Sequence, residues 1–154
     1  MKAMTRRVVL SCGIVSFGTL AVRESRAQGG GNWLVTSQEA TLPVSPTSKA
    51  GRAISRGPAI RQVSPAGPVS PNSPFAFRVE FVGRGGEKID PASAQITLLR
   101  GNNINITQRL RAFISANGVE IPDAMVPPGL YVMQVAVSDA GGRQSLANIE
   151  IEAR

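Results

Sequence analysis

Few residues in this chain have side chains suited to catalysis or metal binding. The sequence of 154 residues contains no histidine and a single cysteine, Cys12. Without histidine the chain cannot form a catalytic triad with an imidazole base, and it lacks the commonest ligands of zinc, copper and haem. The soft ligands beyond residue 27 are Met125 and Met133. We therefore predict no catalytic residue, no cofactor-binding residue and no metal ligand.

The carboxylates do not form a recognisable constellation either. Asp90, Asp123 and Asp139 each stand alone beside a proline or a glycine. Aspartate favours such turns because its side chain accepts hydrogen bonds from nearby backbone N–H groups. Calcium would need several clustered oxygens, and glycoside hydrolysis would need a facing pair of carboxylates. Besides phenylalanine, only Trp33 and Tyr131 could stack on a sugar. We interpret the aspartates as turn residues and the chain as a non-enzyme.

The first 27 residues have the layout of an export signal. Lys2, Arg6 and Arg7 form a basic head, residues 8–22 carry no charge, and Ala27 ends a segment with small residues. This order is typical of a secretory signal, here cleaved after Ala27. A membrane-spanning helix needs about 20 apolar residues, more than this run offers. We expect a periplasmic or secreted protein with no stable membrane span, and an uncleaved anchor is the alternative.

The route of export stays open between two pathways. The sequence Thr5-Arg6-Arg7-Val8-Val9-Leu10 resembles the twin-arginine signal. The Sec pathway requires only a basic head and an apolar run, which this segment also has. The pattern favours the twin-arginine route without excluding Sec.

Signal removal also changes the charge balance. The full chain has 17 Lys and Arg against 10 Asp and Glu, whereas residues 28–154 have 12 against 9. The high basicity of the whole chain comes partly from the signal, so we expect no nucleic-acid partner. No cysteine remains after cleavage, so a buried apolar core rather than a disulfide must stabilise the fold. The remaining length suffices for one domain.

Residues 28–57 are predicted to be a flexible basic linker. They are rich in Gly, Pro, Ser and Thr and show no apolar periodicity. Thr36 and Glu39 have the spacing of a capping box, but a helix of this length is marginal alone. We expect the linker to be dispensable for folding. The alternative is an arm that contacts an anionic envelope polymer or lipid headgroups.

Residues 58–154 read as a series of short strands and turns. Phe75, Phe77, Val79 and Phe81 alternate with outward positions, which is the period of a half-buried strand. The expected strands cover 59–63, 75–82, 94–99, 104–107, 131–137 and 147–151, while 109–114 stays open between strand and helical turn. Asp90-Pro91 is expected to break the chain, and Asn117-Gly118 to form a type I′ hairpin turn with positive φ at both residues.

About seven short strands spaced near ten residues apart predict an all-β fold. The interpretation is an antiparallel β-sandwich over residues 58–154, preceded by the signal at 1–27 and the linker at 28–57. Tyr131 follows a Pro-Gly turn at the start of the penultimate strand. A tyrosine corner lies at this place in such sandwiches. An ordinary half-buried tyrosine is the alternative.

Several motifs in this region resemble those of bacterial immunoglobulin-like domains of exported proteins. They are "IDPAS", "INITQRL", "VPPGLYVMQVAVSDAGGR" and the closing "IEIEA". The resemblance spans about residues 58–154 and implies a fold but no activity, because function does not follow from such a scaffold. The matching residues are Ile89, Asp90, Pro91, Ser93, Ile106, Thr107, Pro128, Gly129, Tyr131, Asp139, Gly142 and Arg143.

The expected function is therefore that of a non-enzymatic envelope module with a binding, accessory or structural role. Its partner would be an envelope protein or polymer of unknown identity. The alternative is a periplasmic carrier of a small ligand or of copper, because some such carriers are β-sandwiches. A third hypothesis places polyanion binding in the linker, since residues 74–154 hold eight bases and eight acids.

Overall fold

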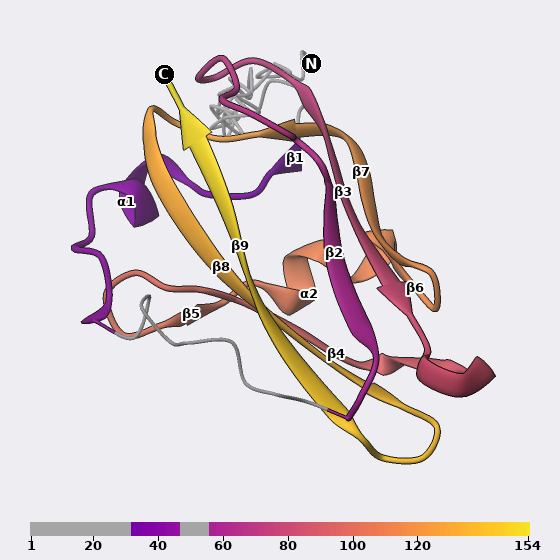
Figure 1. Ribbon diagram of the computed structural model, residues 1–154. Coiled ribbons are helices and arrows are strands. Elements are labelled where there is room, and N and C mark those ends of the chain that lie inside the picture. Colours follow the sequence, from indigo (N-terminus) through magenta and orange to yellow (C-terminus); the bar gives the residue numbers. More distant parts are fainter. Residues whose placement is uncertain (1–31, 47–55) are drawn as a thin grey trace, which may run out of the picture.

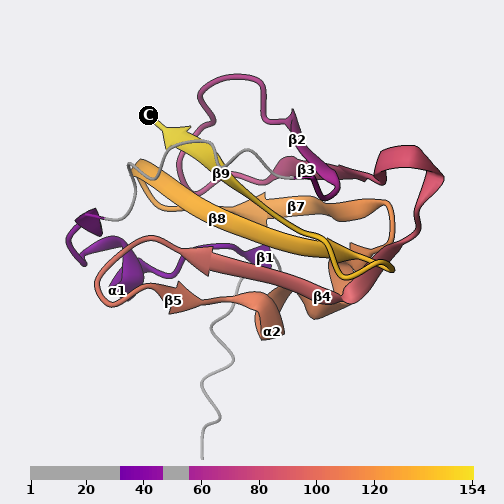
Figure 2. The same cartoon turned by 60° about the horizontal axis from the view of Figure 1, so that its bottom comes forward.

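The protein folds into two β-sheets that stack face to face (Figures 1 and 2). The computed structural model describes residues 32–46 and 56–154. In these ranges one sheet has the order β1-β7-β3-β2, with β6 paired to β7, and the other has the order β5-β4-β8-β9. No helix in the described ranges is long and apolar enough to span a membrane. The all-β sandwich is confirmed, with nine strands in the part of the chain that the structure describes where about seven were expected.

Apart from the two-residue strands β1, β5 and β6, the strands have 6–8 residues in the first sheet and 10–11 in the second. Their bounds are β1 Asn32–Trp33, β2 Ala59–Ser64, β3 Phe75–Val82, β4 Ile89–Leu98, β5 Ile104–Asn105, β6 Ile114–Ser115, β7 Gly118–Met125, β8 Gly129–Asp139 and β9 Gln144–Ala153. The helical turns are α1 Ser37–Ala40, η2 Arg84–Gly86, α2 Thr107–Leu110 and η3 Arg111–Phe113.

The core lies between the two sheets, where the alternating strands meet. The inward positions of β3, including Phe77, are buried, while the positions between them are exposed. The inward positions of β8, among them Tyr131 and Val135, are fully buried on the opposite side. Facing sheets bury such alternating side chains against each other at about 10 Å. The period-two pattern is therefore confirmed for β3, whereas in β8 Val132 and Ala136, which were expected to face outward, are also buried.

The prediction of a flexible linker over residues 28–57 is wrong for residues 32–46. Leu34 and Val35 are 0% exposed and belong to the hydrophobic core. β1 pairs in parallel with β7, and the Leu34 N–H donates to the carbonyl oxygen of Met125 at 3.0 Å. A two-residue strand is too short to show periodicity, although both following residues are apolar and become buried. The folded domain therefore begins well before residue 58.

The other predictions for the N-terminal region concern residues that lie outside the described ranges. These are the signal at residues 1–27 and the segments 28–31 and 47–55. Export and the polyanion-binding arm, which would use Lys49, Arg52 and Arg56, both stay predictions.

Asp90-Pro91 does not end a strand as expected but starts a bulge inside β4. The pairing of β4 with β8 shifts between Asp90 and Gln95. Asp90 Oδ1 accepts a hydrogen bond from Ala92 N at 2.9 Å, and the Ser93 hydroxyl accepts one from Ser138 N at 2.9 Å. These side chains bind backbone groups near the bulge. Proline lacks an N–H, and a bulge tolerates it because the bulged residues do not pair with the neighbouring strand.

A hairpin is present here, but its central residues are 116–117 rather than the predicted Asn117-Gly118, and its turn type also differs. Ser115 pairs with Gly118 at the start of β7. Gly118 has a φ of 143°, whereas Asn72 and Asn103 are the only non-glycine residues of the described ranges with positive φ. Asn117 therefore lacks the conformation that a type I′ turn requires. Glycine is needed at 118 because a Cβ there would lie 1.9 Å from the carbonyl oxygen of Val79.

Candidate functional site

The predicted turn role holds for two of the three aspartates. Asp90 forms the bulge contact described above. Asp139 is buried and accepts hydrogen bonds from Arg143 N and Arg143 Nε, each at 2.9 Å. The backbone hydrogen bond from Arg143 is the main reason why the pKa of Asp139 lies below its ordinary value. Asp123 lies exposed inside β7, so the prediction of a turn role is wrong for this residue.

The described residues do not bring potential metal ligands together. No group of three or more His, Cys, Asp or Glu side chains occurs in the ranges 32–46 and 56–154. Met133 is fully buried in β8, and Met125 ends β7 in the other sheet. The pair therefore offers no methionine cluster at the surface.

A groove on the surface between the two sheets is the best candidate site. β2 and β9, the edge strands of their sheets, lie side by side (Figures 1 and 2). The hollow between them has a volume of about 410 Å³, and we call it the β2–β9 groove. Its lining residues are Gln62, Val63, Pro65, Ala66, Gly67, Pro68, Leu130, Glu150 and Glu152.

Hydrogen bonds fix the walls of this groove. Gln62 Nε2 donates to the carbonyl oxygens of Pro65 at 2.8 Å and Glu150 at 3.1 Å, so one amide links β2, the following loop and β9. Beyond the loop, Val69 N donates to the carbonyl oxygen of Glu152 at 2.8 Å. Proline has a fixed φ, which further restricts this loop at Pro65 and Pro68. The groove is therefore formed before any ligand arrives.

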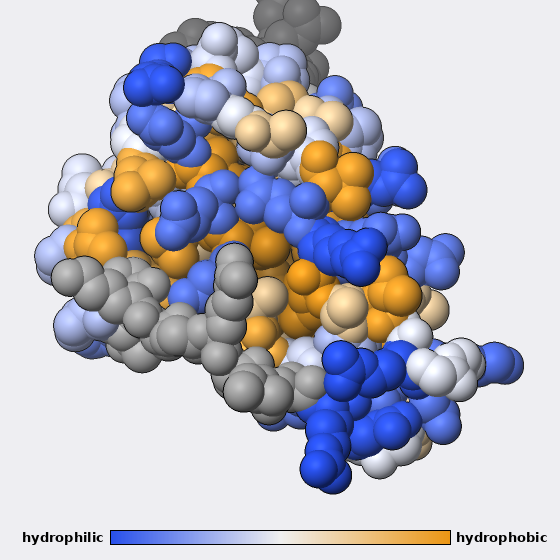
Figure 3. Space-filling model, viewed as in Figure 1, coloured by the Kyte–Doolittle hydropathy of each residue, from blue (hydrophilic) through white to orange (hydrophobic). Residues whose placement is uncertain are grey.

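The groove presents apolar side chains beside negative charge. Val63 is 47% exposed and Leu130 is 51% exposed, and Figure 3 shows apolar side chains among hydrophilic ones on this face. Glu152 pairs with Leu130 across β9 and β8, and Glu150 is the next outward residue of β9. Arg154 Nη1 lies 3.4 Å from Glu152 Oε1. Within the described ranges the Glu150 carboxylate has no ion pair.

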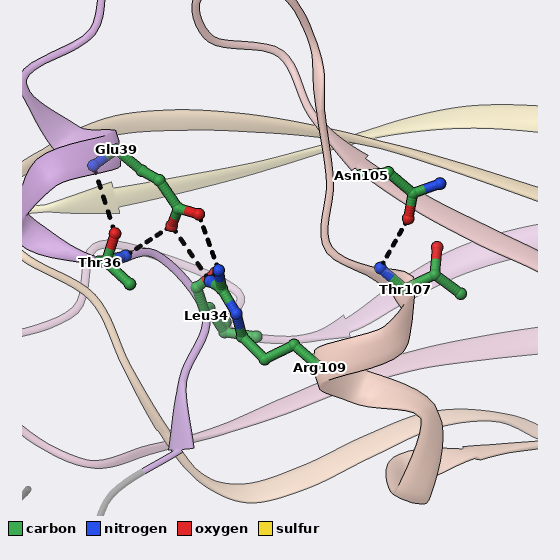
Figure 4. A network of polar contacts seen from close by, with 6 residues as sticks. All are labelled: Leu34, Thr36, Glu39, Asn105, Thr107 and Arg109. Atoms are coloured by element: carbon green, nitrogen blue, oxygen red, sulfur yellow. Dashed lines mark hydrogen bonds and ion pairs between the residues drawn. The ribbon is translucent and has the colours of Figure 1, made fainter.

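A second hollow of about 370 Å³ lies beside β4 and β5. Two of its polar side chains already bind backbone groups. Thr107 Oγ1 accepts a hydrogen bond from Ile96 N at 2.8 Å, and Asn105 Oδ1 accepts one from Thr107 N at 2.9 Å (Figure 4). These contacts hold α2 against the edge of β4, so we assign this hollow a structural role.

Two arginines fasten the N-terminal segment to the sandwich. Arg109 Nη2 lies 2.7 Å from Glu39 Oε1, and Arg109 Nη1 donates to the carbonyl oxygen of Leu34 at 3.0 Å (Figure 4). Thr36 and Glu39 also form the predicted capping box at the start of α1. The segment is therefore held by charge and by hydrogen bonds as well as by its buried apolar residues.

The second arginine, Arg100, connects this segment to the groove. Its Nη1 donates to the carbonyl oxygens of Ala40 at 2.6 Å and Leu42 at 2.8 Å, and its Nη2 donates to that of Leu130 at 2.7 Å. The guanidinium lies 4.8 Å from the centre of the Tyr131 ring, within cation–π range. Arg100 therefore positions the backbone of Leu130 in the groove wall.

Tyr131 forms the predicted tyrosine corner. Its hydroxyl donates to the carbonyl oxygen of Pro128 at 3.0 Å, three residues upstream. Burial raises the pKa of Tyr131, and the nearby Arg100 charge opposes that rise. The contact fixes the turn that leads into β8.

The Glu39–Arg109 pair makes stability depend on pH. The hydrogen bond from Arg109 is the main reason why the pKa of Glu39 lies below its ordinary value of 4.5. A carboxyl with a lowered folded-state pKa stabilises the fold above its unfolded pKa, and this contribution is lost as the pH falls through the folded value. We expect Glu39→Gln to destabilise the protein at neutral pH, with a smaller difference from the wild type at about pH 3. Urea unfolding at both pH values measures this, and a difference independent of pH would refute the assignment.

The fold and the groove define a two-sheet β-sandwich with a preformed surface site. A scan against protein-family models finds no match, and a search of curated proteins finds none either. Among solved structures, CopC from Methylosinus trichosporium OB3b is similar, with a TM-score of 0.41 and 14% sequence identity. The match covers 62% of this chain and 92% of CopC. The fold assignment rests on the strand pairing described above.

Proposed function

We propose that this protein is an exported, non-enzymatic, immunoglobulin-like module that binds a partner in the cell envelope through the β2–β9 groove. The observation that carries the proposal is the groove itself, with fixed walls that expose Val63 and Leu130 beside Glu150, which forms no ion pair with the residues that the structure describes. A single exposed apolar residue is ordinary on a protein surface. A concave, preformed surface that combines apolar side chains with a few polar groups is the usual form of a binding site.

Two features of the sequence support export and the absence of catalysis. Residues 1–27 have the charge layout of a cleaved signal. The chain has no histidine to act as a general base, and Asp90 and Asp139 already accept backbone hydrogen bonds. A binding role needs none of these groups.

Photo-cross-linking in the native host tests the proposal. A photoreactive amino acid replaces Leu130 in the groove or, as a matched control, Arg78 on the exposed face of β3. We expect a cross-linked partner from position 130 but not from position 78, in protein recovered from the envelope with Gln28 as its first residue. Equal cross-linking from both positions, or none, would refute the binding site. Uncleaved protein in the cytoplasm would refute export.

A copper carrier is the second candidate function, because some periplasmic carriers are β-sandwiches. The side chains do not fit a copper site, because the sequence has no histidine and Met133 is buried in the core. Isothermal titration of residues 28–154 with Cu(I) and with Cu(II) separates the candidates. We expect no saturable binding at micromolar metal. Stoichiometric binding that is lost in Met125→Leu would instead establish the carrier.

A further inference from the structure

We infer that the β2–β9 groove binds an extended, cationic polypeptide segment whose basic residues alternate with apolar ones. The inference rests on the proposed function and specifies the chemistry of the partner. Three observations carry it: the shape of the groove, the spacing of its two carboxylates, and the hydrogen bonds that its backbone carbonyl groups already accept.

The size and composition of the groove favour a few side chains of an extended chain. Its volume of about 410 Å³ accommodates several side chains but not a domain. The exposed apolar residues come from different strands, Val63 from β2 and Leu130 from β8. Apolar side chains of a partner would therefore remove water from both walls of the groove.

The charge of the groove selects a basic partner. Glu150 and Glu152 are alternate residues of β9, so they lie on the same face, about 7 Å apart along the strand. Residues i and i+2 of an extended partner have the same spacing. The nearby cation, Arg154, is already paired with Glu152. Anionic partners such as nucleic acids or acidic lipid headgroups would be repelled, because like charges oppose association.

The backbone carbonyl groups of β9 that face the groove already accept hydrogen bonds. A partner must therefore be recognised through side chains. The carbonyl oxygen of Glu150 accepts from Gln62 Nε2, and that of Glu152 accepts from Val69 N. Adding a strand to a sheet edge requires free backbone groups there. We therefore expect the partner to be recognised by charge and apolar contacts, and not by extension of the β9 sheet.

Fluorescence anisotropy with labelled synthetic peptides tests the inference on residues 28–154. The first peptide alternates Lys and Val, the second replaces every Lys with Glu, and the third replaces every Val with Ser. We expect binding of the Lys–Val peptide, no binding of the Glu–Val peptide, and weaker binding of the Lys–Ser peptide. Added salt should weaken the Lys–Val complex, because exposed ion pairs are screened.

Charge variants of the protein complete the experiment. Glu150→Gln with Glu152→Gln should weaken Lys–Val binding about tenfold, because two exposed ion pairs of about 0.7 kcal/mol each sum to about 1.4 kcal/mol. Arg154→Gln should strengthen binding because it frees Glu152. The matched control Glu120→Gln, on the exposed face of β7, should leave the affinity unchanged. Thermal melting of each variant checks that folding is intact.

Two results would overturn the inference. One is equal affinity for the Lys–Val and Glu–Val peptides, and the other is unchanged affinity in the Glu150 and Glu152 double variant. If cross-linking from position 130 persists in either case, the proposed binding function stands and the partner chemistry is wrong. Absence of both peptide binding and cross-linking would overturn the inference and the proposed function together.

Discussion

A chain that begins at Gly57 is expected to lose much of its stability compared with residues 28–154. The truncation removes Leu34 and Val35, which are fully buried, and burial of each such side chain contributes about 1.5–3 kcal/mol. It also removes Glu39, the partner of Arg109, and two of the three carbonyl groups that Arg100 binds. A domain of this size has only about 5–15 kcal/mol of stability in total. Urea unfolding of both chains measures the difference.

A matched pair of substitutions tests, without truncation, whether segment 32–46 contributes to the stability of the fold. Leu34→Ala should cost about 2–5 kcal/mol, because it leaves a cavity in the core. Leu42→Ala, in the same segment but 37% exposed, should cost far less. A truncated chain that melts within a few degrees of the longer one would contradict this result. Segment 32–46 would then be a peripheral attachment.

Phe77→Ala is expected to have the second large effect. Phe77 is 1% exposed and lies on the inward face of β3, opposite the buried side chains of β8. Replacement of a buried phenylalanine by alanine costs about 3–5 kcal/mol. The melting temperature should therefore fall by about ten degrees or more. Calorimetry of the variant and the wild type measures the shift.

Arg78→Ala is the control for this experiment. Arg78 is the next residue of β3 and points to the exposed face. Its replacement should change the free energy of unfolding by about 0.5 kcal/mol or less. Similar losses from Phe77→Ala and Arg78→Ala would show that the inward and outward faces of β3 are assigned incorrectly.

The long strands could be predicted from the sequence because alternation reports directly on which face is buried. β3 has this pattern over its whole length, whereas β8 also buries residues of its second face. The segment around Leu34 could not be predicted in this way, because its strand has two residues and its helix a single turn. Its burial depends on pairing with β7, which lies about 90 residues further along the chain.

The motifs that resemble immunoglobulin-like domains predicted the fold but not the site. Ser93, Thr107 and Asp139 use their side chains to bind backbone groups at a bulge, a strand edge and a hairpin. Tyr131 similarly fixes the turn before β8. These residues match the motifs because their side chains stabilise the backbone of the fold. The motifs therefore do not indicate where a ligand binds.

The β2–β9 groove could not be predicted because its residues come together only in the folded sandwich. Gln62 and Glu150 are 88 residues apart and are joined by one hydrogen bond. In the sequence, residues 65–68 are typical of an ordinary turn, and Glu150 and Glu152 of the solvent face of a strand. The exposed Leu130, at an outward position of β8, is one signal in the sequence that could have indicated an apolar surface.

Hydrogen exchange of the backbone amides most directly tests the claim that the β2–β9 groove binds a partner. Residues 28–154 would be measured in buffer and in soluble envelope extract from the native host, with the extract of an unrelated cell as the control. We predict slower exchange in the native extract for amides of residues 62–69 and 148–152, with no change in β7. Slower exchange confined to β7, or identical exchange in all three solutions, would contradict the proposed binding site.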